Sequence, residues 1–254
     1  MADEILLETR NLRRQFGALV AVADVSIQVK TGSLHSIIGP NGAGKTTFFN
    51  LLSGNLEPTS GQVFFKGRDI TRLPLYRTAH LGIGRSFQIT NIFPNLTVLE
   101  NIRLACQALG QDNFKLFWSH RTFRQYEERA WEVIHQVGLG ERALTPGRTL
   151  PHGDQRKLEL GMILAPDPEL LLLDEPTAGM ASEQVPELMA LIQQIQATGR
   201  KTVMLVEHNM NVVMNVSDKI TVMHYGNVLA EGTPTEISAN ETVQQAYLGG
   251  LYDN

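Results

Sequence analysis

The sequence has almost no cysteine and no long apolar run. Cys106 is the only cysteine in 254 residues, which excludes an internal disulfide framework and is typical of a reducing compartment. No stretch of about 18 consecutive apolar residues occurs, so the sequence predicts no membrane-spanning helix. The first ten residues, MADEILLETR, carry charges where a signal peptide needs an apolar segment. The composition therefore indicates a soluble, globular, cytosolic protein.

A surplus of positive charge is also missing. The chain has 22 Lys and Arg against 26 Asp and Glu, a formal charge of −4. A mildly acidic balance argues against a general nucleic-acid binder, although it leaves room for one local basic patch. Metal-binding spacings such as HExxH or CxxC do not occur. What the chain does have is 43% hydrophobic residues, enough for one large domain with a sizeable core.

Strand-like and helix-like patterns alternate along most of the chain. Residues 5–30 alternate apolar and polar side chains in two stretches, which predicts antiparallel strands. Later strands are expected at 34–38, 61–70, 169–174, 202–207 and 219–232. A helical pattern over 182–199 separates two of the apolar runs, and such alternation predicts a parallel sheet with crossover helices.

The middle of the chain has a different character. From about residue 78 to 160 the pattern is mostly helical, with helices expected at 97–109, at 121–139 and from about 153 onward. Thr97 and Glu100 have the spacing of a capping box at the start of the first of these helices. We therefore expect a single domain over residues 5–250, with a helical subdomain at about 89–160 inserted in the sheet.

One loop carries a strong chemical signal. It matches G-x-x-x-x-G-K-[ST] and lies between a predicted strand and a predicted helix, as a phosphate-binding loop requires. Its residues are Gly39, Pro40, Asn41, Gly42, Ala43, Gly44, Lys45, Thr46 and Thr47. The glycines allow successive N–H groups to point at one phosphate chain, and the helix N-terminus favours the anion. Lys45 can bridge the β- and γ-phosphates, and the Thr46 hydroxyl can ligate Mg²⁺.

Acidic and basic partners for such a loop follow two other strands. Four leucines precede Asp174 and Glu175, which predicts a strand buried on both faces with the carboxylates at its end. Asp174 can orient Mg²⁺, and Glu175 can polarise the water that attacks the γ-phosphate. His208 follows another apolar strand, where a neutral imidazole could bond the γ-phosphate or the water. These residues predict a nucleoside triphosphatase site.

With these residues in view, the chain resembles the nucleotide-binding subunit of an ABC transporter over essentially its whole length. Lys45 and Thr46 match Walker A, Asp174 matches Walker B, Glu175 matches the catalytic glutamate and His208 the switch histidine. The resemblance implies an α/β fold: a P-loop NTPase core with a mixed or parallel sheet, an N-terminal antiparallel β subdomain and an inserted helical subdomain.

The resemblance assigns three further residues near the nucleotide. Gln88 matches the Q-loop glutamine, which senses Mg²⁺ and water and faces the transmembrane partner. Phe16 matches the aromatic residue that stacks on adenine, and Val22 lies where a small apolar residue flanks the nucleotide. The implied cofactors are ATP and Mg²⁺, with Thr46, Gln88 and Asp174 around the metal.

The segment matching the family's LSGGQ signature departs from it. Leu150 and Gly153 match, but Pro151 replaces the serine and removes one hydroxyl. His152 replaces a glycine, and Asp154 replaces the glutamine and adds negative charge near a nucleotide. The segment is expected to open a helix, whose N–H groups can still face phosphate. Two chains would then pair head to tail, each signature serving the other chain's phosphate site.

The resemblance also implies partners. The second ATPase subunit is an identical or paralogous chain, and transmembrane permeases are expected to dock in a groove near Gln88. A periplasmic or extracellular binding protein acts indirectly, nucleic acid is not a partner, and the location is the cytoplasmic face of the inner or plasma membrane. The runs 82–102 and 207–234 resemble subunits of branched-chain amino-acid importers. Urea or short-amide importers are the alternative.

Three rival interpretations stay open. A soluble ABC ATPase of DNA repair or translation usually carries two nucleotide domains or long coiled-coil insertions, for which 254 residues leave no room. A small-molecule kinase has no reason to carry Gln88, His208 and the signature segment together. A catalytically weak regulatory subunit is suggested by Pro151, by Asp154, and by Ala181, which stands where the family usually has Asp or Asn.

Overall fold

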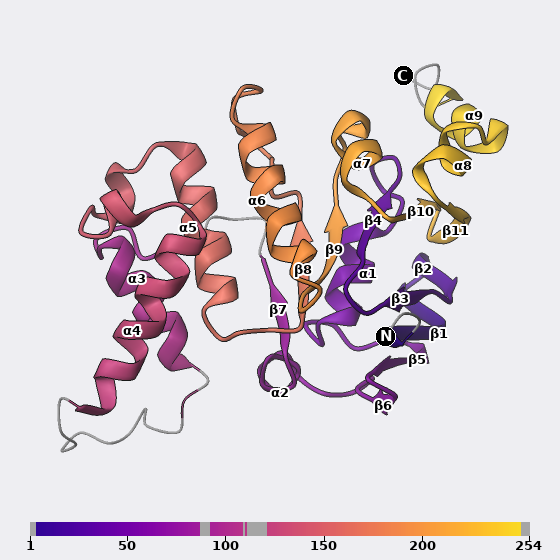
Figure 1. The fold of residues 1–254 in the computed structure, drawn as a ribbon. Helices are drawn as coiled ribbons and strands as arrows, with labels where there is room; N and C mark the ends of the chain where they lie inside the picture. Colours follow the sequence, from indigo (N-terminus) through magenta and orange to yellow (C-terminus); the bar gives the residue numbers. More distant parts are fainter. Residues whose placement is uncertain (1–3, 87–91, 109, 111–120, 250–254) are drawn as a thin grey trace.

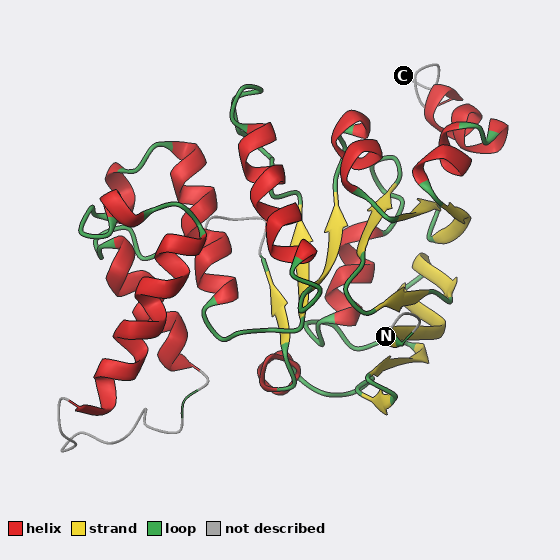
Figure 2. Ribbon diagram, viewed as in Figure 1, coloured by secondary structure: helices red, strands yellow, loops and turns green. Residues whose placement is uncertain are grey.

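The computed structural model describes residues 4–86, 92–108, 110 and 121–249. Within these ranges no helix is long and apolar enough to cross a membrane. Two sheets and a separate group of helices make up the architecture (Figures 1 and 2).

The larger sheet has six strands in the order β11-β10-β4-β9-β8-β7. They are β4 (Leu34–Ile38), β7 (Ile83–Arg85), β8 (Leu170–Asp174), β9 (Thr202–Val206), β10 (Lys219–His224) and β11 (Asn227–Gly232). All neighbours pair in parallel except β10 and β11, which form an antiparallel hairpin. Every residue of β4, β8 and β9 is buried, because both faces of these central strands are covered.

The smaller sheet is antiparallel and is formed mainly by the N-terminal part of the chain. Its strands are β1 (Ile5–Phe16), β2 (Leu19–Val25), β3 (Gln28–Lys30), β5 (Ser60–Phe65) and β6 (Arg68–Asp69). One hydrophobic core joins it to the larger sheet, with Phe48 and Phe49 of helix α1 (Lys45–Leu52) fully buried in it. This packing fixes α1, and therefore the loop before it, between the two sheets.

A second core lies on the other face of the larger sheet. It contains residues of α3 (Val98–Ala108), α4 (Arg121–Gln136), α5 (His152–Leu164) and α6 (Val185–Ala197). Helices α3, α4 and α5 form a group beside the sheet (Figure 1). The shorter helices are α2 (Leu75–His80), α7 (Met210–Val216), α8 (Pro234–Ser238) and α9 (Glu241–Gly249).

Most of the expected elements are confirmed, with one correction. The backbone N–H of Glu100 donates to Thr97 Oγ1 (3.1 Å), and that of Thr97 donates to Glu100 Oε2 (2.9 Å), so the capping box is present. The expectation that residues from about 78 to 160 are mostly helical is wrong at Ile83–Arg85. These residues form the strand β7, which pairs with β8. The domain boundaries 5–250 and 89–160 stay predictions.

Candidate functional site

The glycine-rich loop connects the end of β4 to the start of α1. Gly39, Gly42 and Gly44 have φ of +151°, +79° and +99°, a backbone that side chains with a Cβ rarely adopt. A Cβ on Gly44 would lie 2.2 Å from the carbonyl oxygen of Ala21, and one on Gly39 would lie 2.2 Å from that of Met223. The loop is therefore pressed against β2 and β10, and only glycine fits at these two contacts.

Lys45 begins α1 and points back into the loop. Its side chain is nearly buried (6% exposed), and Nζ donates to the carbonyl oxygens of Gly39 (2.7 Å) and Pro40 (3.0 Å). Burial lowers the pKa of Lys45, while the charges of Glu175 and Asp174 act in the opposite direction. The ammonium group is thus bonded to two backbone carbonyl oxygens and is close enough to two carboxylates for their charges to act on it.

A cleft of about 440 Å³ opens above this loop. The loop and the start of α1 supply Asn41, Gly42, Ala43, Gly44, Lys45, Thr46 and Thr47. Glu175 and His208 also line it, so the fold brings together groups more than 100 residues apart in sequence. Gly39 and Pro40, the first two residues of the loop, are not part of the cleft's described lining.

Asp174 ends β8 with an unusual environment. It is 3% exposed, and neither carboxylate oxygen has a hydrogen-bond partner among the described residues. Burial raises the pKa of this carboxyl, against the opposing effect of the Arg85 guanidinium. A buried carboxylate without partners is unfavourable unless a cation neutralises it. The two free oxygens of the Asp174 carboxylate therefore fit a hard divalent cation such as Mg²⁺.

Glu175 and His208 form a direct pair. His208 Nε2 and Glu175 Oε1 lie 2.6 Å apart. Glu175 has a φ of +51°, uncommon for a side chain of this size, and its N–H donates to Val206 O (2.9 Å). The strained backbone aims the carboxylate at the cleft, where a base would act on water.

The nucleoside end of the cleft differs from the predicted set. Leu19, Val20 and Ala21 of β2 line it, whereas the Val22 side chain is fully buried in the core. The Val22 side chain thus faces the core side of β2, and its contact with a nucleotide stays a prediction. Phe16, 44% exposed, is not among the cleft's described lining residues, and the Arg14 guanidinium stacks on its ring at 4.5 Å.

The signature segment lies in the helical group. Leu150 and Gly153 are buried, while Pro151 caps α5 and His152 is its first residue. The Asp154 carboxylate pairs with Arg142 Nε (2.9 Å) and Lys157 Nζ (3.6 Å), so two cations offset the extra charge. None of residues 150–154 lines the described part of the Lys45 cleft.

Comparison with known proteins identifies the family. A model described as ABC transporter matches residues 22–178, which is more than half of the chain. The chain belongs to the ABC transporter family. A second model, described as branched-chain amino acid ATP-binding cassette transporter, matches residues 227–253.

Similar proteins of known family agree with this assignment. The chain is 39% identical to the high-affinity branched-chain amino acid transport ATP-binding proteins LivG of Salmonella typhimurium and BraF of Pseudomonas aeruginosa, over 96% of this chain and 98% of each relative. It is 33% identical to the lipopolysaccharide export system ATP-binding protein LptB of Acidithiobacillus ferridurans, over 97% of this chain and 98% of that relative.

Solved ABC cassettes share the fold. The ADP conformation of MJ1267 superposes with a TM-score of 0.84 at 28% identity, covering 97% of this chain and 100% of that one. The dimeric structure of MJ0796 gives 0.76 at 26% identity, covering 90% and 99%. The chain is accordingly an ABC ATPase with the nucleotide-binding cassette fold predicted from its motifs.

Besides Leu19, Val20 and Ala21, two further residues at the site were missed from sequence. Glu207 is buried; its carboxylate accepts hydrogen bonds from Thr177 N (3.1 Å), Thr177 Oγ1 (2.6 Å) and His208 N (3.2 Å). It ties the loop after Glu175 to the loop that carries His208, and its only signal is an acidic residue at the end of an apolar strand. Tyr225, the second, lines the cleft from the turn after β10.

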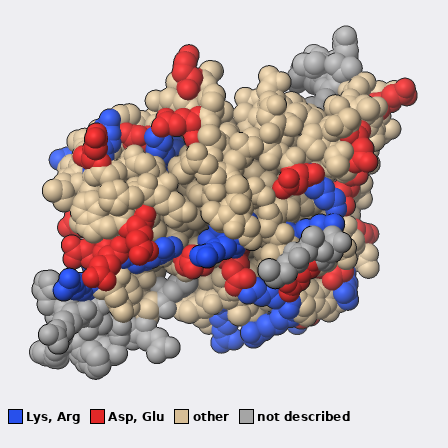
Figure 3. Space-filling model, in the orientation of Figure 1, with Lys and Arg blue, Asp and Glu red and all other residues tan. Residues whose placement is uncertain are grey.

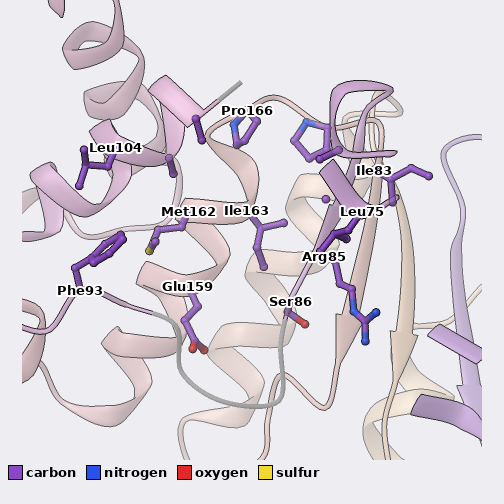
Figure 4. A pocket seen from close by; sticks show the side chains of 15 residues that line it. Leu75, Ile83, Arg85, Ser86, Phe93, Leu104, Glu159, Met162, Ile163 and Pro166 are labelled. Carbon is purple, nitrogen blue, oxygen red and sulfur yellow. The ribbon is translucent and has the colours of Figure 1, made fainter. Parts of the chain in front are cut away.

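A groove also lies between the cassette's sheet and its helical group. It has a volume of about 500 Å³ and a mostly apolar lining, which includes Leu75, Ile83, Phe93, Leu104, Met162 and Ile163 (Figure 4). Ser86 also lines it, and Gln88, two residues on, lies outside the described residues.

On the face in Figure 3, Lys and Arg are interspersed with Asp and Glu and gather at the lower edge, near β5 and β6.

Proposed function

We propose that this ATPase powers the import of branched-chain or other hydrophobic amino acids through a membrane transporter. The Glu175–His208 pair, facing Lys45 in one cleft, is the observation that carries the catalytic part. The likeness to LivG and BraF and the match over 227–253 support the substrate class. The alternatives are a urea or short-amide importer and a catalytically weak regulatory subunit.

In this mechanism the loop N–H groups, Lys45 and Thr46 bind the phosphate chain. Glu175 accepts a proton from the attacking water. His208, whose Nε2 lies 2.6 Å from Glu175 Oε1, orients that carboxylate; the same N–H can donate to the γ-phosphate instead once it releases Glu175. Asp174 and Thr46, with Gln88, would hold Mg²⁺, which when bound offsets the charge of the phosphates. Phe16 is proposed to stack on adenine.

The regulatory alternative gains little from Asp154. Its negative charge would repel ATP if it faced the nucleotide alone. Because Arg142 and Lys157 offset it, the start of α5 can still present N–H groups to a phosphate. We therefore propose that residues 150–154 complete the phosphate site of a second copy or paralogue.

The apolar groove is the proposed docking site for the permeases. A short amphipathic helix from each permease would place its apolar face against Leu104, Met162 and Ile163, the helix-in-groove mode of recognition. This places the ATPase peripherally, on the cytoplasmic face of the membrane, with a substrate-binding protein acting through the permeases.

The test is phosphate release by the chain assembled with its permeases in proteoliposomes. We expect ATPase activity that Lys45→Ala abolishes, because the ammonium no longer bridges the phosphates. Leucine and urea, each with its binding protein, distinguish the two substrate classes by which one is taken up. Full activity of Lys45→Ala would contradict the site, and uptake of urea alone would contradict the amino-acid proposal.

A further inference from the structure

The turn between β10 and β11 carries an aromatic side chain at a position that disfavours one. His224 pairs with Asn227, so the turn consists of Tyr225 and Gly226. Both have positive φ, +46° and +79°, as in a type I′ hairpin turn. Such turns favour Asn-Gly, because a bulky side chain at the first position is sterically costly. The turn itself therefore gives no reason for tyrosine.

Burial does not explain Tyr225 either. Its side chain is 77% exposed, with a tilted ring contact to His224 at 4.2 Å between centroids. It nevertheless lines the cleft that contains Thr46 and Thr47. A large exposed ring that gains little from folding, yet borders a cleft, is available to a ligand.

Backbone hydrogen bonds hold this turn against the phosphate loop. Gly226 N donates to Ala43 O (3.0 Å), and Ala23 N donates to Gly226 O (2.7 Å). A Cβ on Gly226 would lie 3.0 Å from Ala21 O, so the turn packs closely on β2. The turn that carries Tyr225 is therefore fixed relative to the phosphate loop and to β2.

We infer that Tyr225 contacts the nucleoside part of the nucleotide, an inference that rests on the proposed ATP binding. The polar loop recognises phosphates, whereas a purine ring needs an apolar or aromatic surface. Tyr225 and Leu19, which is 67% exposed, supply that surface inside the cleft. Phe16 already has the Arg14 guanidinium over its ring, so one of its faces is covered.

The experiment compares two ligands by titration calorimetry on the full chain: ATP and inorganic tripolyphosphate, which lacks the nucleoside. Tyr225→Asn removes the ring and keeps a residue that tolerates positive φ. We expect about tenfold weaker ATP binding, the usual effect of losing one stacked ring, and little change for tripolyphosphate. Tyr225→Phe keeps the ring and should bind ATP as the unmodified chain does.

A matched control is Tyr76→Ala. Tyr76 is a 61% exposed tyrosine on α2 that does not line the cleft, so its loss should leave both affinities unchanged. Unchanged ATP affinity in Tyr225→Asn overturns the inference, as does an equal loss for both ligands, which would mean damage to the phosphate loop. If the unmodified chain binds tripolyphosphate but not ATP, or neither, the proposed function fails as well.

Discussion

At the scale of single residues, the Asp174 carboxylate is suited to binding a cation but lowers the stability of the protein without one. Its buried carboxylate has no described hydrogen-bond partner, and burial raises its pKa. The folded state therefore holds a proton that the unfolded chain releases. Stability contributed by the neutral form is lost as pH rises from the unfolded pKa through the raised one, so the ionised carboxylate above that window destabilises the fold.

This opposition predicts the behaviour of Asp174→Asn. Without nucleotide or metal at pH 7, the free energy of unfolding of the variant should be higher by about 1 kcal/mol, because the variant buries no unpaired charge. Its unfolding midpoint in urea should therefore move to a higher concentration. Adding Mg²⁺ and ATP should stabilise the unmodified chain against urea, but the variant much less. The opposite order of stability in the absence of ligand would show that attraction to the Arg85 guanidinium outweighs the cost of burying the Asp174 carboxylate.

Replacing Glu175 should lower the rate of ATP hydrolysis without changing the affinity for ATP. Glu175→Gln keeps the shape and one acceptor but removes the base, so phosphate release should fall by about 10²–10⁴-fold while ATP affinity changes little. Stopped-flow phosphate detection and calorimetry measure the two quantities separately. Near-normal turnover by Glu175→Gln would assign the base to another group.

How much of the site the sequence can specify depends on how local each residue's role is. Lys45 and Thr46 belong to one short motif whose spacing states the chemistry. Tyr225 reaches the cleft only because two hairpins meet at Gly226 and β2, a juxtaposition no local pattern encodes. The face on which Val22 lies is equally hard to predict, because a shift of one residue along a strand reverses the face.

At the scale of elements, short segments escaped prediction. The strand β7 is only Ile-Gly-Arg, too short for a period, and exists because it pairs with β8 at the sheet edge. Helix α7, with seven residues, similarly lacks enough turns to show a stripe. The long apolar runs of β4, β8 and β9 were predictable because burial on both faces dictates their composition.

The phosphate loop offers a matched pair of glycine substitutions. Gly42 and Gly44 both have positive φ, but a Cβ on Gly42 has open space whereas one on Gly44 meets Ala21 O at 2.2 Å. Gly42→Ala should cost about 1–2 kcal/mol of unfolding free energy from backbone strain alone. Gly44→Ala should cost about 3 kcal/mol or more, because the clash with β2 adds to the strain.

Urea denaturation without nucleotide measures this difference between the two variants. Because both substitutions add the same methyl group, the comparison isolates the contact between the loop and β2. Equal costs would mean that the loop can move away from β2, and that its position is set by α1 alone.

At the scale of the whole molecule, the proposed dimer requires each chain to contribute to two different sites. The cleft around Lys45 contains Glu175 and His208 but none of residues 150–154 in its described lining. Those residues lie with the helical group beside the sheet (Figure 1). The dimeric cassette MJ0796 has the same fold, so pairing of two copies is a natural way to unite the halves.

Mixing two inactive variants tests this pairing. A Glu175→Gln chain keeps its signature segment, and a Gly153→Asp chain keeps its phosphate loop, Glu175 and His208. Each homodimer should be nearly inactive: the first lacks the base, and the second places a carboxylate at the start of α5. In a mixed dimer, one of the two sites combines an intact cleft from the second chain with an intact signature from the first.

We therefore expect the mixture to recover phosphate release, approaching about a quarter of the unmodified rate at equal amounts if pairing is random and the two sites turn over independently. Half of the dimers are then mixed, and each has one complete site.

Unfolding curves of both variants provide the control that each chain is folded. Failure of every mixing ratio to exceed the sum of the separate activities would show that the signature segment does not act on the partner's nucleotide, or that both sites must be intact together. The specific activity of the unmodified chain, measured at several protein concentrations, separates these two explanations. It should rise with protein concentration only if two copies must pair to hydrolyse ATP.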